Sequence, residues 1–197
     1  MNSSRLSAGA RRQQILDVAI DEFGRTGYFG TSMNDIAEAA GVTKPVLYQH
    51  FDSKADLYRA LLDEVGTRML ELIAKATSDA SDGRERTERG FGAYFRWVAD
   101  HHREFTLLFG GSARQEGEFA AQIRRINEAA ATAIAGLIDI DIDSTHRETI
   151  AHALVGLAEG ASRRLVGLGE SFDPDEIASV VSQLAWAGLR AVDRDHR

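Results

Sequence analysis

The sequence predicts an all-α fold, and three features of its 197 residues lead to that prediction. Proline occurs only at positions 45 and 174, which leaves long stretches of chain free to be helical. Apolar residues recur at helical spacing, for example from Ile15 through Phe23. Glycines and Ser-x-x-Asp sequences separate these periodic segments, as helix ends and helix caps do. We therefore expect about nine helices.

Composition excludes several classes of protein. With 44% hydrophobic and 27% charged residues, the chain has the balance of a globular protein. It has no cysteine, which excludes disulfides, thiolate metal sites and cysteine nucleophiles. No apolar run approaches the roughly 18 residues needed to span a bilayer, and the N-terminus lacks the apolar core of a signal peptide. We expect a cytoplasmic protein that does not bind membranes.

The acidic charge is unevenly distributed. The net charge is -7, which argues against nucleic-acid binding by the chain as a whole, because phosphates attract clustered Lys and Arg. Residues 1–60, however, carry seven basic and seven acidic side chains, so the excess acid lies entirely in residues 61–197. A neutral N-terminal part can bind DNA while an acidic remainder does not. The expected domains are residues 1–52 and residues 53–197.

Two helices are predicted near the N-terminus. The first begins after Arg11 and ends at Gly27, a glycine placed as in a helix C-terminal cap. Ser32 and Asp35 form a capping-box pattern, in which each side chain satisfies an amide at the start of a helix. That pattern opens a second, short helix, which runs from Met33 to about Ala40.

A tight turn and a third helix follow. Gly41 supplies a residue that adopts positive φ without strain. Thr43 can cap the third helix, and Pro45 is tolerated in its first turn because amides there have no intrahelical acceptor. The order of short helix, tight turn and short helix is that of a helix-turn-helix. A hairpin used only for packing would have the same spacing.

The outer surface of the third helix favours DNA binding over the packing hairpin. A solvated helix commonly carries Glu–Lys pairs four residues apart. This helix instead carries hydrogen-bond donors beside a small apolar edge, which suits the major groove of DNA. The residues are Lys44, Pro45, Val46, Tyr48, Gln49 and His50.

Further helices are predicted along the rest of the chain. Ser53 and Asp56 form a second capping box at the start of a long helix. Small polar residues at 78–82 interrupt the periodicity, and each later segment has an apolar stripe. The predicted ranges are 53–76, 86–102, 105–109, 118–138, 145–168 and 175–192.

Residues 31–58 resemble the DNA-binding signature of the TetR family of transcriptional regulators. The resemblance combines Gly41 of the turn, the Leu-Tyr-Gln-His-Phe segment at 47–51 and Lys54 in one register. It extends over roughly residues 11–65. It implies a homodimer that holds a palindromic operator under the control of a small ligand. The C-terminal part of the family is too divergent for its residues to be carried over by motif.

The resemblance assigns roles to individual positions. Tyr48, His50 and Lys54 match positions that contact DNA phosphates. Thr31 and Ser32 match the start of the second helix, where exposed amides and the helix dipole favour an anion. The positions nearest the bases are Thr43, Lys44, Pro45 and Val46, and Lys44 and Gln49 can hydrogen-bond to base edges.

Small residues on the last two helices predict a dimer interface. Gly156 and Gly160 lie one turn apart, and Leu184 and Gly188 share a stripe on the final helix. Packing within one chain is the alternative, but two consecutive helices with small faces fit the four-helix interface of the resembled family. A dimer places two recognition helices about one DNA turn (~34–36 Å) apart, which predicts an operator with two-fold symmetry.

Apolar side chains are concentrated between residues 91 and 126, and they predict a pocket for a hydrophobic effector. Segments in this chain also resemble actinobacterial TetR-type regulators of fatty-acid synthesis, which implies a fatty acyl effector. Glu159 and Arg163 are either a polar anchor in this pocket or a surface ion pair, with the ion pair favoured. The predicted lining consists of Phe91, Tyr94, Phe95, Phe105, Leu108, Phe109, Phe119, Ile123 and Ile126.

The sequence thus predicts a repressor that a small hydrophobic effector releases from DNA. The alternative is a helix-turn-helix regulator that acts as an activator, or through a protein partner, without a small ligand. An enzyme is not expected, because the chain has no Gly-x-Ser-x-Gly elbow, phosphate loop or zinc-binding helix motif. His101 and His102 point about 100° apart on a helix, so no metal and no cofactor are expected.

Overall fold

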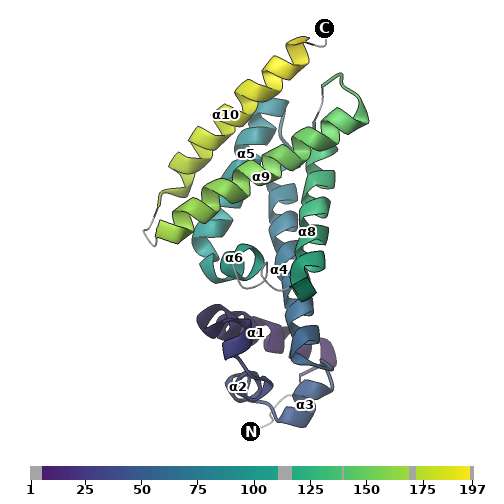
Figure 1. Cartoon of the computed structure of the whole chain (residues 1–197), viewed down its shortest axis with the longest axis vertical. Coiled ribbons are helices and arrows are strands. Elements are labelled where there is room, and N and C mark those ends of the chain that lie inside the picture. Colours follow the sequence, from purple (N-terminus) through teal and green to yellow (C-terminus); the bar gives the residue numbers. More distant parts are fainter. Residues whose placement is uncertain (1–5, 111–116, 139, 169–171, 196–197) are drawn as a thin grey trace. The chain divides into compact units, whose positions relative to one another are not determined.

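The computed structural model describes residues 6–110, 117–138, 140–168 and 172–195, and within these ranges it confirms the all-α prediction (Figure 1). The described residues form nine helices. The helices are α1 (Ala8–Gly30), α2 (Met33–Ala39), α3 (Lys44–Tyr48), α4 (Lys54–Thr77), α5 (Gly83–Asp100), α6 (His102–Phe109), α8 (Gly117–Ala135), α9 (Ser144–Leu168) and α10 (Pro174–Asp195). None of them is long and apolar enough to cross a membrane.

The chain forms two compact units. The first, called here the head unit, comprises residues 1–65 and 103–122. The second, called the body unit, comprises residues 66–102 and 123–197. Helices α4 and α8 contribute residues to both units. This division by packing is not the same as the functional division into residues 1–52 and 53–197, which stays a prediction.

Gly27 interrupts α1. Its φ of 74° lies in the left-handed region, as predicted for a glycine at a helix end. The helix resumes after the kink and ends at Gly30, three residues beyond the predicted end. At the other end, the Ser7 side chain accepts a hydrogen bond from the Ala10 amide, so α1 begins at Ala8 rather than after Arg11.

An aromatic cluster forms the centre of the head unit. The ring of Tyr58 in α4 lies 4.9 Å from Phe23 of α1 and 4.7 Å from Phe119 of α8. Tyr28 packs 4.8 Å from Phe119. Each full burial of such a ring contributes roughly 1.5–3 kcal/mol. The cluster therefore joins α1, α4 and α8, which are distant in the sequence.

The helix caps explain where two predictions are off by a few residues. Ser53 caps α4 by accepting from the Asp56 amide, as predicted, but the Asp56 carboxylate accepts from the Asp52 amide rather than from that of Ser53. Helix α5 begins at Gly83 instead of residue 86, because the Asp82 side chain accepts from the Glu85 amide. Cap residues, more than the apolar periodicity, thus set these helix starts.

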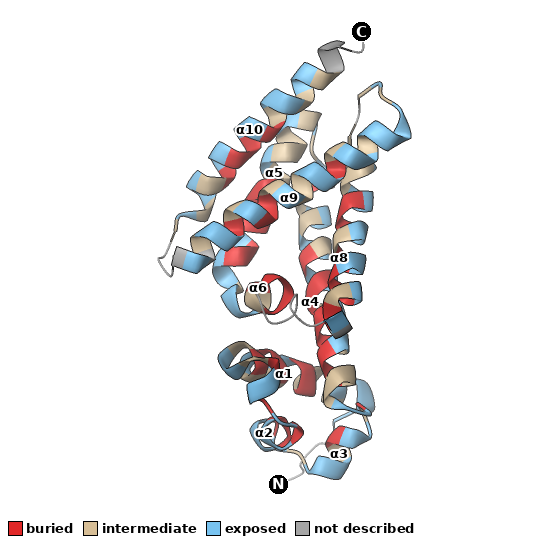
Figure 2. Ribbon diagram, in the orientation of Figure 1, coloured by how far each residue is buried: buried red, intermediate tan, exposed pale blue. Residues whose placement is uncertain are grey.

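In the body unit, α10 packs along α5, and α9 also contacts both of these helices. One face of α10 is buried through Ala178, Val181 and Ala185. Buried and exposed residues alternate along this helix, so that its other face is open (Figure 2). The ring of Trp186 lies 3.2 Å from the position that a Cβ on Gly83 would take, so α10 approaches the start of α5 closely.

Candidate nucleic-acid interface

The start of α2 is held by a complete capping box. The Ser32 side chain accepts from the Asp35 amide, and the Asp35 carboxylate accepts from the Ser32 amide at 2.8 Å. The same carboxylate accepts from the Ser32 hydroxyl at 2.7 Å. These bonds to Ser32 lower the pKa of Asp35 below its ordinary value. The prediction of a capping box at this position is confirmed.

The turn between α2 and α3 is built around Gly41, whose φ of 62° confirms the predicted positive φ. The Gly41 amide donates to the Glu38 carbonyl at 3.0 Å, and the Val42 amide donates to the Ala37 carbonyl at 2.9 Å. Leu47 of α3 is fully buried and anchors the helix from the inside. The turn and this anchor fix α3 against α2, which is the arrangement of a helix-turn-helix.

The outer side of α3 carries the side chains that the sequence assigns to DNA. Thr43, Lys44, Pro45, Tyr48 and Gln49 are exposed, whereas Val46 and His50 are half-buried. One expectation is wrong: Thr43 occupies the cap position of α3, but its side chain makes no capping hydrogen bond. The exposed Thr43 hydroxyl can therefore serve a different partner.

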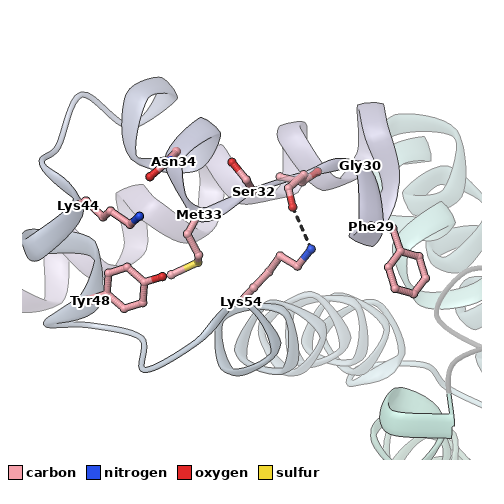
Figure 3. Close-up of a pocket in the computed structure, with 9 residues that line it drawn as sticks. Phe29, Gly30, Ser32, Met33, Asn34, Lys44, Tyr48 and Lys54 are labelled. Carbon is pink, nitrogen blue, oxygen red and sulfur yellow. Dashed lines mark hydrogen bonds between the residues drawn. The ribbon is translucent and has the colours of Figure 1, made fainter.

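A hollow of about 380 Å³ lies beside α3 (Figure 3). Helix α3 contributes Lys44 and Tyr48, and α4 contributes Lys54. Ser32 and Asn34 line it from the start of α2. The sequence analysis did not include Asn34 among the DNA-contacting residues. Its position two residues after the cap Ser32 could have indicated it, because it lies in the first turn of α2. The hollow thus combines two cations with hydroxyl and amide groups, the donor set that phosphate oxygens accept from.

Lys54 has a structural role in addition to its charge. Its Nζ donates to the carbonyl of Tyr28 at 2.8 Å and to that of Thr31 at 3.0 Å, and the latter bond is drawn in Figure 3. The same Nζ lies 4.4 Å from the centre of the Tyr28 ring. An ammonium has three N–H donors, so these two bonds leave one for a ligand in the hollow.

Thr31 differs from the other predicted DNA-contacting residues because its side chain is buried. Its hydroxyl lies 2.7 Å from the Thr26 hydroxyl and donates to the Gly27 carbonyl at 2.8 Å. The side chain therefore closes the end of α1, where the kink at Gly27 leaves carbonyls without helical partners. Any contact of Thr31 with DNA would have to come from its backbone.

Comparison with known proteins agrees with the geometry of this surface. Residues 15–61 match the family model described as bacterial regulatory proteins of the tetR family, and residues 83–188 match a tetracyclin repressor-like C-terminal domain. The HTH-type transcriptional activator FasR of Mycolicibacterium smegmatis is 32% identical over 96% of this chain and 87% of its own length. The chain belongs to the TetR family.

Solved structures of TetR-like proteins have the same fold. A TetR-like transcriptional regulator from a Rhodococcus species is 31% identical, with a TM-score of 0.75, over 94% of this chain and 99% of its own. FadR of Bacillus subtilis, solved in complex with stearoyl-CoA, is 18% identical, with a TM-score of 0.78, over 88% of this chain and 96% of its own. This TetR-family chain is a DNA-binding transcriptional regulator, and its relatives are not enzymes.

The residues predicted to line an effector pocket of this TetR-family chain are all buried, but they belong to different units. Phe119 is part of the aromatic cluster of the head unit. Phe91 and Phe95 stack on each other in α5 of the body unit, with ring centres 6.3 Å apart. The head unit holds Phe105, Leu108, Phe109 and Phe119, and the body unit holds Phe91, Tyr94, Phe95, Ile123 and Ile126.

The residues predicted for the dimer interface are open in the single chain. Leu184 is 63% exposed. A Cβ added at Gly156, Gly160 or Gly188 would meet nothing within 4 Å. These glycines therefore make no close contact with another helix in the part of the chain that the structure describes, and the dimer interface stays a prediction. Ala185, on the neighbouring stripe of α10, does face inward.

Glu159 and Arg163 form the expected ion pair, with 3.0 Å between Oε2 and the guanidinium. The pair is not an ordinary surface pair, because only 5% of Glu159 is exposed. The carboxylate lies inside the body unit, whereas the Arg163 side chain reaches the surface. The favoured interpretation from sequence is wrong for Glu159.

Proposed function

We propose that this chain is a homodimeric repressor that binds a two-fold symmetric operator and that a small hydrophobic effector releases. One observation carries the DNA-binding part. Exposed Lys44 and Tyr48 and half-buried Lys54 surround a hollow on a helix-turn-helix whose α2 capping box and Gly41 turn are formed. A preformed surface with cationic and hydroxyl groups suits the phosphate backbone next to a major groove.

Contacts to DNA divide into two groups in this proposal. Phosphates are bound by Ser32, Tyr48, His50 and the remaining donor of Lys54, with the Thr31 contact limited to its backbone. Bases are read from the start and outer side of α3. Lys44 and Gln49 hydrogen-bond to base edges, and the Thr43 hydroxyl, which makes no capping bond, adds a third polar contact. Pro45 and Val46 contact thymine methyl groups.

The dimer rests on the open face of α9 and α10. Val180 and Leu184 lie four residues apart on α10, and both are more than 60% exposed. Apolar side chains beside the open glycines of α9 form the kind of patch that marks an interface. A second copy of this chain would cover Gly156, Gly160, Leu184 and Gly188.

For the effector we propose a compound with a fatty acyl chain. The buried aromatic residues of α5 offer it an apolar wall. FadR of Bacillus subtilis, which holds stearoyl-CoA, supports the proposal only in that the same fold accommodates such a chain. Protein-partner control without a small ligand is the alternative, and it predicts that acyl compounds leave operator affinity unchanged.

Activation of transcription is a second candidate function, because the relative FasR is described as a transcriptional activator. The chemistry of DNA binding is the same in both cases. A regulator that overlaps a promoter represses it, whereas one bound upstream activates. A reporter gene placed behind the selected operator, with and without the regulator, distinguishes the two.

The central test is the selection of bound fragments from genomic or random DNA with the full chain. We expect a palindrome whose half-sites are about one helical turn apart. The matched control is a Lys44→Met, Tyr48→Phe double variant, which removes two exposed donors and should enrich no sequence. Recovery of no common sequence by the unmodified chain, together with a monomeric mass, would overturn the proposal.

A further inference from the structure

One large apolar side chain of the head unit is open to solvent. The Phe29 side chain, at the end of α1, is 74% exposed, more than any other large apolar residue that the structure describes. Its neighbour Tyr28 is buried in the aromatic cluster, against Phe119. A single exposed apolar residue is common on protein surfaces. What distinguishes Phe29 is its place beside the helix-turn-helix.

Phe29 lines the same hollow as the residues that we propose to bind phosphates. In Figure 3 its ring stands at one end of the hollow and Tyr48 at the other, with Lys54 between them. Ser32 and Lys44 add further donors. The hollow thus offers hydrogen-bond donors to a phosphate and, at one end, an apolar surface.

Packing holds the Phe29 ring in place before any ligand arrives. It meets the Tyr28 ring edge to face, with 5.5 Å between the ring centres and 72° between the ring planes. Tyr28 in turn packs 5.0 Å from Tyr58 of α4, and the Lys54 Nζ lies 4.4 Å from the centre of the Tyr28 ring. A side chain that a neighbour already orders loses little freedom on binding. The apolar end of the hollow is therefore preorganised, like its cationic part.

The backbone of DNA matches this combination of surfaces. Each phosphate is bonded to a sugar on either side, so a phosphate beside Lys54 necessarily has a deoxyribose, with its apolar carbon atoms, next to it. We propose that the Phe29 ring covers this deoxyribose and is thereby a further DNA-contacting residue. The contact removes apolar surface of both partners from water, and it carries no sequence information because every nucleotide has the same sugar. This inference rests on the proposed phosphate contacts of the hollow.

The affinity of Phe29→Ala for DNA tests the contact. Fluorescence anisotropy with the full chain gives the Kd for a duplex that carries the selected operator and for a duplex of unrelated sequence, at several salt concentrations. We expect the variant to bind both duplexes at least about fivefold more weakly, because part of an aromatic ring is no longer buried against DNA. Equal affinities of the variant and the wild type would overturn the inference.

The salt dependence separates this apolar contact from an ionic one. Phe29→Ala removes no charge, so the slope of log affinity against log salt should stay as in the wild type, whereas Lys44→Met should reduce the slope by about one. The factor by which Phe29→Ala weakens binding should also be the same for both duplexes. A loss confined to the operator would show a contact with a base and contradict the inference.

Further variants show whether apolar surface at this position is the cause. Phe29→Leu keeps an apolar side chain and should retain most of the affinity for DNA, whereas Phe29→Asn should bind as weakly as Phe29→Ala. The matched control is Leu72→Ala, at a 40% exposed leucine of the body unit, which should leave the affinity unchanged. A leucine variant as weak as the alanine variant, or an equal loss in the control, contradicts the assignment.

Measurements without DNA exclude a structural role. Phe29→Ala should keep a Tm and an oligomeric mass close to those of the wild type, because the side chain is 74% exposed in the chain. A large fall in Tm, or a changed mass, would show that the ring serves the fold or a contact between copies and would refute the inference.

The outcomes also separate this inference from the proposed function. If the wild type selects no operator but Phe29→Ala still weakens binding to the unrelated duplex, the contact stands and operator recognition fails. If the wild type binds a selected operator and Phe29→Ala binds it equally well, only the role of Phe29 fails.

Discussion

The head unit satisfies its polar groups within the chain, whereas the body unit leaves apolar side chains exposed. In the head unit, Ser32 and Asp35 satisfy each other, and Lys54 and Thr31 donate to carbonyls at the end of α1. In the body unit, Glu159 is buried and ion-paired with Arg163, while the apolar residues Val180 and Leu184 of α10 are left exposed. The proposed DNA-binding surface is therefore held in place by hydrogen bonds within a single chain. A second copy of this chain would cover the exposed apolar residues of the body unit in the proposed dimer.

This difference between the two units predicts which property each substitution should change. Changes in the head unit should alter folding and DNA binding of the chain itself. Changes in the body unit should act through the second copy or the effector and leave the fold of each chain intact.

Leu184→Glu should have the largest effect. It places a charge in the proposed dimer interface, so we expect a monomer in sedimentation and a loss of operator affinity of about a hundredfold or more, because two linked half-site contacts become one. Circular dichroism should show an unchanged helix content, since Leu184 is 63% exposed in the chain. Leu137→Glu, at a 37% exposed leucine outside α9 and α10, is the control and should stay dimeric. A dimeric Leu184→Glu variant would contradict the proposed interface.

Lys54→Met and Lys44→Met should separate folding from DNA binding within the head unit. Both variants should weaken operator binding and reduce the slope of log affinity against log salt by about one. Only Lys54→Met should also lower the free energy of unfolding, by about 2 kcal/mol, because it removes two charge-assisted hydrogen bonds to carbonyls. Urea unfolding measures this. Equal stability of the two variants would mean that the bonds of Lys54 contribute little to the fold.

Gly41→Ala should lower stability by roughly 1–2 kcal/mol, because an alanine is strained at a φ of 62°. Gly41→Asn should cost less, since asparagine tolerates the left-handed region better than alanine. Space is not the cause, because a Cβ on Gly41 would meet nothing within 4 Å. Thermal unfolding of the pair measures the difference, and an alanine variant as stable as the wild type would refute the strain argument.

Asp35→Asn should have the smallest effect and depend on pH. The pKa of Asp35 is held below its ordinary value of 3.8 by hydrogen bonds from Ser32, so its stabilisation is present above that pH. It is lost as the pH falls through the lower pKa of the folded chain. The difference in free energy of unfolding between wild type and variant should therefore close in acid. Asp52→Asn, at an exposed position, is the control. A difference that persists in acid would contradict the capping role.

The sequence predicted interactions between residues that are close along the chain, but not those between residues that are far apart. The capping box of Ser32 and the positive φ of Gly41 could be predicted, because each depends on residues within a few positions. The bonds of Lys54 to carbonyls 23 and 26 residues away could not, since they require the packing of α4 against the end of α1. Burial of Glu159 escaped prediction for the same reason. An acidic and a basic residue four positions apart form the same sequence pattern on an exposed helix face and at a contact with another helix. Only the packing of that other helix shows which case applies.

The exposed stripe at Val180 and Leu184 has a consequence for gene control. If two chains must meet on this face before the operator is occupied, occupancy at low expression rises with the square of the protein concentration. Halving the amount of regulator would then remove about three quarters of the bound operator, where a monomeric regulator would lose half. The apolar residues that each chain leaves uncovered would thereby sharpen the response of the gene to the number of regulator molecules in the cell.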